Sequence, residues 1–278
     1  MRINTNIAAM NTYSRLTAAN TAKTNSLAKL SSGSRINKAG DDAAGLAISE
    51  KMKSQIGGLT QAKRNAQDGI SLVQTAEGAL NESHSILERM RDLAVQGAND
   101  TLTSDDRGSI NKELTALHEE LTRIASTTEY NTKNLLNKAN NAFTFQIGAN
   151  ENQTLTVTIG AMDGTTLLGS TDKTFKISSG ATNVRMANGM ISKIDKAIAT
   201  VSSQRAALGA VQNRLEHTIN NLTATNENLS DANSRIRDVD MAEEMMTFTK
   251  SNILSQAATS MLAQANAMPN SVLNLLQG

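Results

Sequence analysis

Seven branched aliphatic side chains recur at every seventh position in the C-terminal half of the chain, and this spacing constrains the fold most. A seven-residue apolar repeat keeps one face of an α-helix apolar, and such a face forms the seam of a coiled coil. The interleaved positions are mixed, since Ile198, Val211 and Ile219 are apolar whereas Gln204 and Thr225 are polar. The repeat therefore predicts a long helix. Its coiled-coil core residues are Ile194, Val201, Leu208, Leu215, Leu222, Leu229 and Ile236.

The N-terminal half also has helical spacing. Apolar steps of three and four residues alternate through two segments, and Ser83 occupies the one weak turn of the first. A polar stretch separates the segments, and Thr103 or Ser104 is the candidate N-cap of the second. With the heptad segment, these patterns predict three long helices, over about 43–98, 104–127 and 184–236.

The middle of the chain differs in composition. Residues 140–183 are rich in Thr, Gly and Asn. Within them, "FTFQI" (143–147) and "LTVTI" (155–159) alternate with the period of two typical of strands, which predicts a β-hairpin. "TFKI" (174–177) is a candidate third strand. We expect a small β-rich insertion between two helical arms.

Both ends of the chain carry apolar stripes. Burying a large apolar side chain stabilises by about 1.5–3 kcal/mol, whereas ordering each residue costs about 1–2 kcal/mol for the backbone alone. A pair of terminal helices therefore gains too little by itself, and we expect it to need other chains. The candidate self-assembly seam consists of Leu254, Ala258, Met261, Ala265, Met268, Val272 and Leu275, with Ile3, Ile7 and Met10 at the other end.

Breaks separate the ends from the middle. The glycines of 31–52 predict a flexible connection, and Asp41 or Asp42 is the candidate cap of the next helix. Asp41 and Asp42 together with Glu50 could also be interpreted as paired carboxylates for acid–base chemistry. We expect these side chains instead to cap the helix and to form salt bridges. Pro269 lacks an N–H group, so the last helix should kink or restart near it.

Composition excludes several classes of function. The net charge of +1 provides no pull toward nucleic acid or anionic membranes, and aromatic residues make up only 2% of the chain. With no cysteine, the chain has no disulfides and no thiolate metal sites. The N-terminus lacks the apolar run of a secretory signal, and no stretch approaches the roughly 18 apolar residues of a membrane span. Taken alone, these features predict a soluble, cytoplasmic helical protein.

The chain offers little catalytic chemistry. His84, His118 and His217 are isolated from one another, so we expect exposed helical histidines rather than metal ligands. The segment "HEEL" at 118–121 lacks the second histidine of the zinc signature, because residue 122 is Thr122. We therefore expect no metal, no cofactor and no enzyme activity.

Several long motifs resemble those of bacterial flagellins. They include "MRINTNIAAMNT", "KLSSGSRINKAGDDAAGLAISEKM", "SSQRAALGAVQNRLEHTINNL", "NENLSDANSRIRDVDMAEEM" and "ILSQAATSMLAQANAMPNSVLNLL". The resemblance covers about 1–150 and 185–278 and is greatest to flagellins of Bacillus-like bacteria. Because little chain remains between the arms, it is identified as a short form without large outer domains.

The resemblance implies a structural subunit that polymerises into the extracellular flagellar filament for motility. In such a mainly α fold, both arms form a long antiparallel helical bundle, and the insertion adds a small β-hairpin. Residues 1–33 and 238–278 would form the inner layer of the filament, and 34–237 the helical domain around it. The alternatives are a hook–filament junction protein of the same superfamily and a hydrolase carried on a filament scaffold. The missing zinc signature argues against the hydrolase.

The resemblance also implies partners. They are further copies of the chain, the export chaperone, the type III export apparatus that secretes the subunit unfolded, and the filament cap and hook-junction proteins. Arg89, Leu93 and Glu113 match the surface that packs between subunits and contacts Toll-like receptor 5 of animal hosts. No nucleic acid and no membrane insertion are implied.

Overall fold

The computed structural model describes the backbone of residues 5–169 and 183–277, and the side chains of residues 5–169 and 186–268. The chain divides into two compact units. Unit 1 comprises Met1–Ile56 and Glu227–Gly278, and unit 2 comprises Gly57–Asn226. Each unit is described by itself below.

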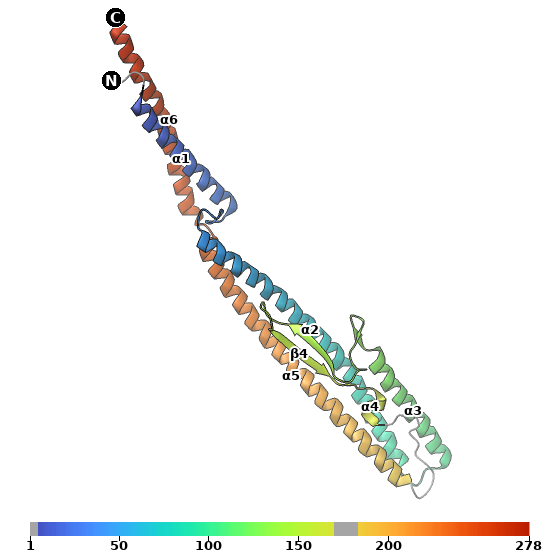
Figure 1. Cartoon of the computed structure of the whole chain (residues 1–278). Coiled ribbons are helices and arrows are strands. Elements are labelled where there is room, and N and C mark those ends of the chain that lie inside the picture. The colour runs from blue at the N-terminus through green and yellow to red at the C-terminus, as the bar shows by residue number, and fades with distance from the viewer. Residues whose placement is uncertain (1–4, 170–182, 278) are drawn as a thin grey trace. The chain divides into compact units, whose positions relative to one another are not determined.

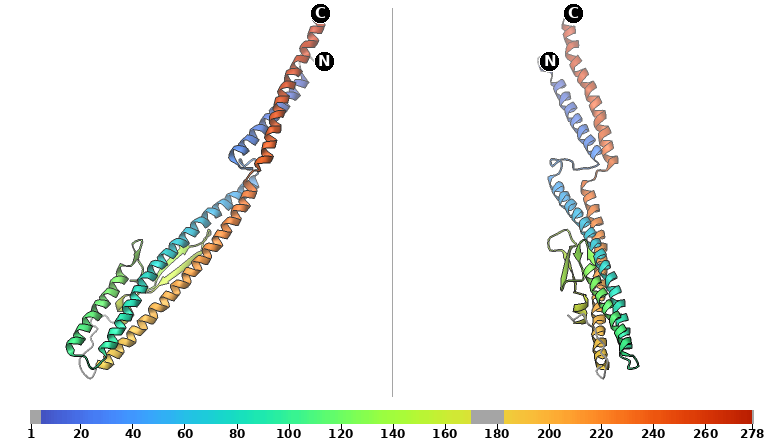
Figure 2. Two further views of the ribbon diagram at one scale, coloured as in Figure 1. Left: turned by 180° about the vertical axis from the view of Figure 1, so that it is seen from behind. Right: turned by 90° about the vertical axis from the view of Figure 1, so that its right-hand side faces the viewer.

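Unit 1 is built on a pair of antiparallel helices. Helix α1 (Ile7–Ser32) lies alongside helix α6 (Met241–Gln277), as both Figure 1 and Figure 2 show. Polar side chains tie the pair together: Lys23 Nζ donates to Asn252 Oδ1 at 2.9 Å, and Ser255 Oγ donates to Asn20 Oδ1 at 2.8 Å. The two ends of the chain therefore pair with each other, as the matched apolar stripes suggest.

Helix α6 runs without interruption to Gln277, so the predicted restart near Pro269 is wrong. A proline has no N–H group to donate to the carbonyl four residues earlier, which here belongs to Ala265. That carbonyl instead accepts a hydrogen bond of 2.8 Å from Asn6 Nδ2. Asn6 is also the N-cap of α1, because its Oδ1 accepts from the Ala9 N–H at 3.0 Å. One amide thus caps α1 and bonds to the carbonyl that Pro269 leaves free.

The break after α1 is shorter than expected. Helix α1 ends with Gly33 in the left-handed region (φ 67°), and helix α2 (Ala43–Gly97) begins ten residues later. The connection is pinned, since the Arg35 N–H donates to the Arg237 carbonyl at 2.6 Å and the Val239 N–H donates to the Gly33 carbonyl at 3.1 Å. The expectation of a flexible connection over 31–52 is therefore wrong in extent, because both of its ends are helical.

The carboxylates near this break have structural roles. Asp42 Oδ1 accepts from the Gly45 N–H at 2.8 Å and caps α2. Asp41 accepts from the backbone N–H groups of Lys38 and Asn37, and these hydrogen bonds lower the pKa of its carboxyl group. Glu50 forms an ion pair of 2.7 Å with the guanidinium of Arg237. Capping and salt bridging thus account for all three carboxylates.

Unit 2 contains the main core. Helix α2 runs antiparallel to helix α5 (Asn183–Arg237), and within the unit Asn226 Nδ2 donates to Thr60 Oγ1 at 3.0 Å. Arg91 Nε lies 2.8 Å from Asp195 Oδ1 between the same helices. Helix α3 (Ser104–Thr127) packs its apolar face onto the same core. The prediction of a mainly α fold with long helices from both arms is confirmed.

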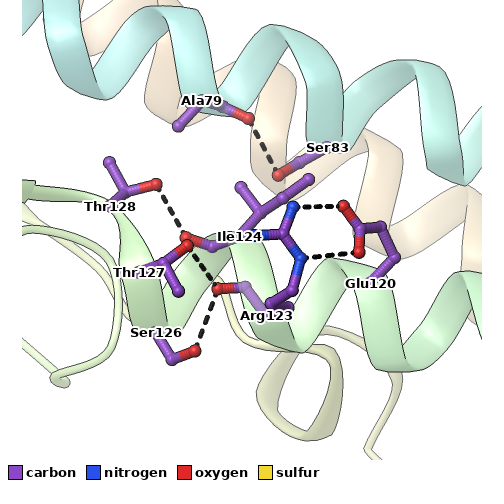
Figure 3. Close-up of polar contacts among 8 residues, drawn as sticks. All are labelled: Ala79, Ser83, Glu120, Arg123, Ile124, Ser126, Thr127 and Thr128. Carbon is purple, nitrogen blue, oxygen red and sulfur yellow. Dashed lines mark hydrogen bonds and ion pairs between the residues drawn. The ribbon is translucent and has the colours of Figure 1, made fainter.

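Local side-chain contacts define both ends of α3. Thr103 is the N-cap, and with Asp106 it forms a capping box in which each side chain accepts from the other residue's N–H. At the other end Ser126 and Thr127 donate to the Arg123 carbonyl, and Thr128 Oγ1 donates to the Ile124 carbonyl at 2.7 Å (Figure 3). The Ile124 carbonyl also accepts from the Thr128 N–H at 3.0 Å. The Ala125 and Ser126 carbonyls, which the end of the helix leaves without a backbone partner, accept from Asn134 Nδ2 at 3.2 Å and 2.6 Å.

The hairpin in the insertion is present as predicted. Strands β3 (Asn141–Gln146) and β4 (Thr154–Ile159) pair antiparallel, with Phe145 opposite Leu155. Alternate residues of β4 are buried, which is the period of two seen in the sequence. The candidate strand at 174–177 lies outside the described residues.

Two smaller elements, one before the insertion and one within it, were not predicted. Strands β1 (Glu129–Tyr130) and β2 (Lys133–Asn134) form a short antiparallel hairpin with a two-residue turn. Its turn has positive φ at Asn131 and Thr132. Helix α4 (Gly164–Leu168) follows β4 and is capped by Asp163.

Side-chain amides from the two long helices hold the β3–β4 hairpin in place. Asn65 Nδ2 on α2 donates to the Gln146 carbonyl at 3.0 Å, and Gln204 Nε2 on α5 donates to the Thr158 carbonyl at 3.1 Å. Each strand of a two-stranded sheet is an edge, and these amides satisfy exposed carbonyls there. The turn of the hairpin also contacts α2, where a Cβ added to Gly58 would lie 2.9 Å from Ala149 Cβ.

Adjacent glycines of α2 test this contact. Ala at Gly57, which faces open space, should stabilise unit 2 by up to about 1 kcal/mol through helix propensity. Ala at Gly58 should lose that gain, because its Cβ meets the Ala149 backbone. Urea unfolding followed by circular dichroism measures both variants. Equal stabilisation by Gly57→Ala and Gly58→Ala would show that the turn does not pack on α2.

A second pair of substitutions tests the Asn6 contact. Asn6→Ser keeps a capping oxygen but is too short to reach Ala265, so α1 should dock less tightly. We expect a loss of about 1 kcal/mol, which is roughly fivefold in the exchange rate of α1 amide hydrogens. In a Pro269→Ala background the loss caused by Asn6→Ser should be smaller, because residue 269 then has an N–H group that can donate to the Ala265 carbonyl. Equal effects in both backgrounds would contradict the assignment.

Candidate assembly surface

Buried and exposed apolar side chains separate almost completely between the two units. Among the described residues, every buried apolar side chain lies in unit 2 except Ile36 and Ala265. Of the large apolar side chains that the structure describes, every exposed one lies in unit 1 except Val95 and Met186. Unit 2 therefore has a closed core, whereas unit 1 presents most of its large apolar groups to solvent.

On α1, these groups form a stripe along the first two turns. Ile7, Met10 and Tyr13 are 59%, 64% and 63% exposed. Steps of three residues keep them on neighbouring parts of one helix face. The N-terminal seam predicted from Ile7 and Met10 is thus uncovered in a single copy, and Ile3 lies outside the described residues.

On α6, the predicted seam divides by side-chain size. Leu254, Met261 and Met268 follow at intervals of seven residues and are 51%, 65% and 54% exposed. Ala265 lies between them in sequence, is buried, and presents its carbonyl to Asn6 of α1. Ala258 is half-buried. The small residues thus pack toward α1 and the large ones remain exposed.

Further exposed apolar groups lie in the first turns of α6 and near the start of α2. The last two residues of the predicted seam, Val272 and Leu275, have side chains outside the described residues. Fully burying one such group stabilises by about 1.5–3 kcal/mol, so covering several of them would be strongly favourable. The additional exposed residues of unit 1 are Leu27, Ile48, Met241, Met245, Met246 and Ile253.

Two serines are buried in the described part of the α1–α6 pair. Ser26 on α1 and Ser251 on α6 are 4% and 6% exposed, although serine is usually found at the surface. Their positions agree with the register set by the Lys23–Asn252 bond. Small serines allow close helix approach, but they bury little apolar area, so the pair has no large core of its own. Periodicity in apolar residues did not identify these contacts.

The predicted coiled-coil core follows the same division. Ile194, Val201 and Leu208 are essentially inaccessible, and Leu215 and Leu222 are also buried, all within unit 2. Leu229 and Ile236, which belong to unit 1, are only half-buried. The heptad repeat continues without interruption through these positions. The lower burial of Leu229 and Ile236 therefore reflects the residues around this part of the helix and not a change in the repeat.

The structure separates the three residues of the predicted receptor and inter-subunit face. Arg89 Nη2 forms an exposed ion pair of 2.7 Å with Glu113 Oε1, so these two side chains lie together on the surface. Leu93 is only 2% exposed and belongs to the core of unit 2, so its place on that face is wrong. The cause is helical phase: Leu93 continues the buried stripe of Met90 and Ala94.

The three histidines differ in environment. His118 is 2% exposed, so the expectation of an exposed side chain is wrong for it. Helix α4 covers it, and a Cβ added to Gly164 would lie 2.8 Å from His118 Nε2. His84 pairs with Glu88 across one helical turn, and His217 is exposed.

In the part of the chain that the structure describes, no three His, Cys, Asp or Glu side chains gather where they could hold a metal ion. Over the same residues, no helix combines the length and apolar character needed to cross a membrane. The uncovered apolar surface of unit 1 is therefore the feature that we interpret functionally, and we call it the assembly surface. It is taken as the exposed large apolar residues in the first turns of α1 and along α6, which are Ile7, Met10, Tyr13, Met241, Met245, Met246, Ile253, Leu254, Met261 and Met268.

Comparison with known proteins gives consistent matches along the chain. Residues 3–141 match the family model for the bacterial flagellin N-terminal helical region, and residues 191–276 match that for the C-terminal helical region. The chain is 52% identical to the flagellin of Bacillus subtilis (strain 168) over 305 aligned positions, with all of both chains covered. It is 50% identical to the flagellin of Halalkalibacterium halodurans over 277 positions, again with both chains fully covered.

A solved structure shares the fold at low identity. The putative flagellar hook-associated protein of Vibrio parahaemolyticus has a TM-score of 0.59 and 13% identity, covering 71% of this chain and all of that one. At this identity the likeness concerns the fold alone. The two family models and the full-length relatives decide the family: the chain belongs to the bacterial flagellins.

Proposed function

We propose that the chain is the structural subunit of an extracellular bacterial flagellar filament and that it polymerises through its assembly surface. One observation supports this mechanism most: large apolar side chains are exposed on α1 and α6 of unit 1, while the core of unit 2 is closed. Association of copies would bury these side chains. The net charge of +1 gives little electrostatic drive, so we attribute association to helix–helix burial.

The same surface suits the other partners of the proposed role. An exposed apolar face is an aggregation hazard before secretion, so a chaperone that covers the C-terminal part of α6 would keep the subunit soluble. We propose that the export chaperone binds to this part of α6. The other proposed partners are the type III export apparatus, the filament cap and the hook-junction proteins. A catalytic role forms no part of the proposal.

The alternative role as a hook–filament junction protein makes a different prediction. A junction protein shares the helical architecture but does not form long polymers. The full-length relatives with 50–52% identity carry the flagellin name, which favours the filament subunit. Electron microscopy of the purified protein after seeding distinguishes the two, because only a filament subunit yields long filaments.

Truncation tests the role of α6. Removing residues 254–278 deletes the exposed stripe of α6 but leaves unit 2 intact. We expect no filaments by electron microscopy, together with an unchanged unfolding transition of unit 2. Filaments formed by the truncated chain would contradict the proposed surface.

A single substitution tests the surface without removing chain. Met261→Lys should leave the monomer folded, because the side chain is 65% exposed, but should prevent polymerisation by burying a charge between copies. Met186→Lys is the matched control, since that methionine is 48% exposed and lies in unit 2. Sedimentation after seeding measures both. Equal polymerisation by the two variants would show that Met261 is not buried between subunits.

We also propose that the exposed Arg89–Glu113 pair lies on the face recognised by Toll-like receptor 5. Both side chains are about half exposed and joined by a 2.7 Å ion pair, so they lie together as one polar feature of the surface. Leu93 would act only by supporting the helix from within the core.

A reporter-cell assay tests this second role. Arg89→Ala in monomeric protein should lower potency about tenfold, because charged anchor residues dominate interface energetics. Arg123→Ala is the control, since Arg123 makes a similar exposed ion pair with Glu120 at 2.6 Å elsewhere on unit 2 (Figure 3). A wild-type monomer that gives no response, or equal effects of both substitutions, would remove receptor recognition from the proposal.

A further inference from the structure

Methionine is distributed unevenly in this chain. The sequence has 12 methionines and no cysteine, so thioethers are its only sulfur groups. Of the methionines whose side chains the structure describes, Met90, Met162 and Met190 are buried in unit 2. The assembly surface, in contrast, exposes six methionines, each by about half or more. They are Met10, Met241, Met245, Met246, Met261 and Met268.

An exposed thioether reacts readily with peroxides. The sulfur lone pair attacks one oxygen of hydrogen peroxide, an S–O bond forms, and the O–O bond breaks. The departing hydroxide takes the proton of the hydroxyl group now bound to sulfur and leaves as water, so the sulfur is oxidised by two electrons and the peroxide is reduced. The product is a sulfoxide, which is polar and chiral where the thioether was apolar and flexible.

We propose that the six exposed methionines of the assembly surface are an oxidation-sensitive modification site, whose conversion to sulfoxides by hydrogen peroxide blocks polymerisation of the free subunit. This inference rests on the proposed function. It adds a chemical control of the surface and names the class of reagent that exerts it.

The placement of the sulfurs supports this control. Met261 and Met268 are seven residues apart on the exposed stripe of α6 that Leu254 begins, and Met10 is in the exposed stripe of α1. Met241 and Met245 are four residues apart, which places them on one face of the first turns of α6. Oxidation would therefore put polar oxygens along the length of the surface rather than at one point.

The same geometry predicts protection after assembly. Side chains buried between copies are shielded from solvent, so their sulfurs should react slowly in the filament. The buried methionines of unit 2 should resist oxidation in both states, because the core already excludes them from solvent. Met186, which is exposed in unit 2, provides an internal reference for peroxide access.

Peptide mass spectrometry of peroxide-treated protein tests the site. In free subunits the six methionines should gain one oxygen each, while Met90, Met162 and Met190 should not. In preformed filaments the six should react at least about tenfold more slowly than in the free subunit. Equal rates in both states would overturn the proposed shielding, with Met186 showing whether peroxide reached the protein.

Polymerisation of the oxidised subunit tests the consequence. We expect the critical concentration to rise at least about tenfold, equivalent to about 1.4 kcal/mol per subunit. Methionine sulfoxide reductase should restore it. A variant with all six methionines replaced by leucine should polymerise with or without peroxide, whereas Met186→Leu should remain as sensitive as the wild type.

The outcomes separate this inference from the proposed function. Untreated wild-type protein that forms no filaments would overturn both. Protein that carries the six sulfoxides yet polymerises at an unchanged critical concentration would overturn only the oxidation control. If the six-leucine variant fails to polymerise, recovery of the oxidised wild type by the reductase decides the question, and no recovery counts against the inference.

Discussion

The behaviour of this protein depends on the large apolar side chains that a single copy leaves exposed to water. Water penalises each exposed methionine, leucine or isoleucine, and intramolecular burial is the usual remedy. Unit 2 uses that remedy, because its long helices, its β-hairpin and α4 enclose a main core and a smaller buried cluster. Unit 1 pairs α1 with α6 through small residues and amide hydrogen bonds, and leaves its larger apolar groups outside.

Helix α6 has buried small residues and exposed large ones, and this difference in size explains how one helix can contact both α1 and a neighbouring copy. Ala265 faces α1, where a small side chain and a free carbonyl allow the Asn6 amide to approach. Leu254, Met261 and Met268 remain exposed. A larger residue at position 265 would separate the helices, and smaller residues at the exposed positions would weaken association. The sizes along the stripe thus suit pairing within a copy and association between copies.

Much of the fold follows from periodicity. The heptad run from Ile194, the stripes of the N-terminal arm and the alternation in β3 and β4 each correspond to an observed element. Period alone does not say which chain covers an apolar face, however. Leu208 and Leu229 occupy equivalent positions of one repeat, yet the first is buried and the second half-buried.

Leu93, His118 and Pro269 each depart from what the sequence predicts, and each departure has a physical cause. Leu93 matched a surface motif, but its helical phase places it in the core. His118 is polar, yet α4 covers it from a segment far along the chain, and no local pattern signals such a contact. Pro269 was expected to kink α6 or make it restart, but α6 continues to Gln277, and the missing N–H is offset by an amide from the opposite end of the chain.

The density of a polymer determined by cryo-electron microscopy tests the central claim most directly. The account predicts that Ile7, Met10, Tyr13 and Met261 lie buried against neighbouring copies, whereas a polymer held together by unit 2 alone, with these side chains still in solvent, would contradict it.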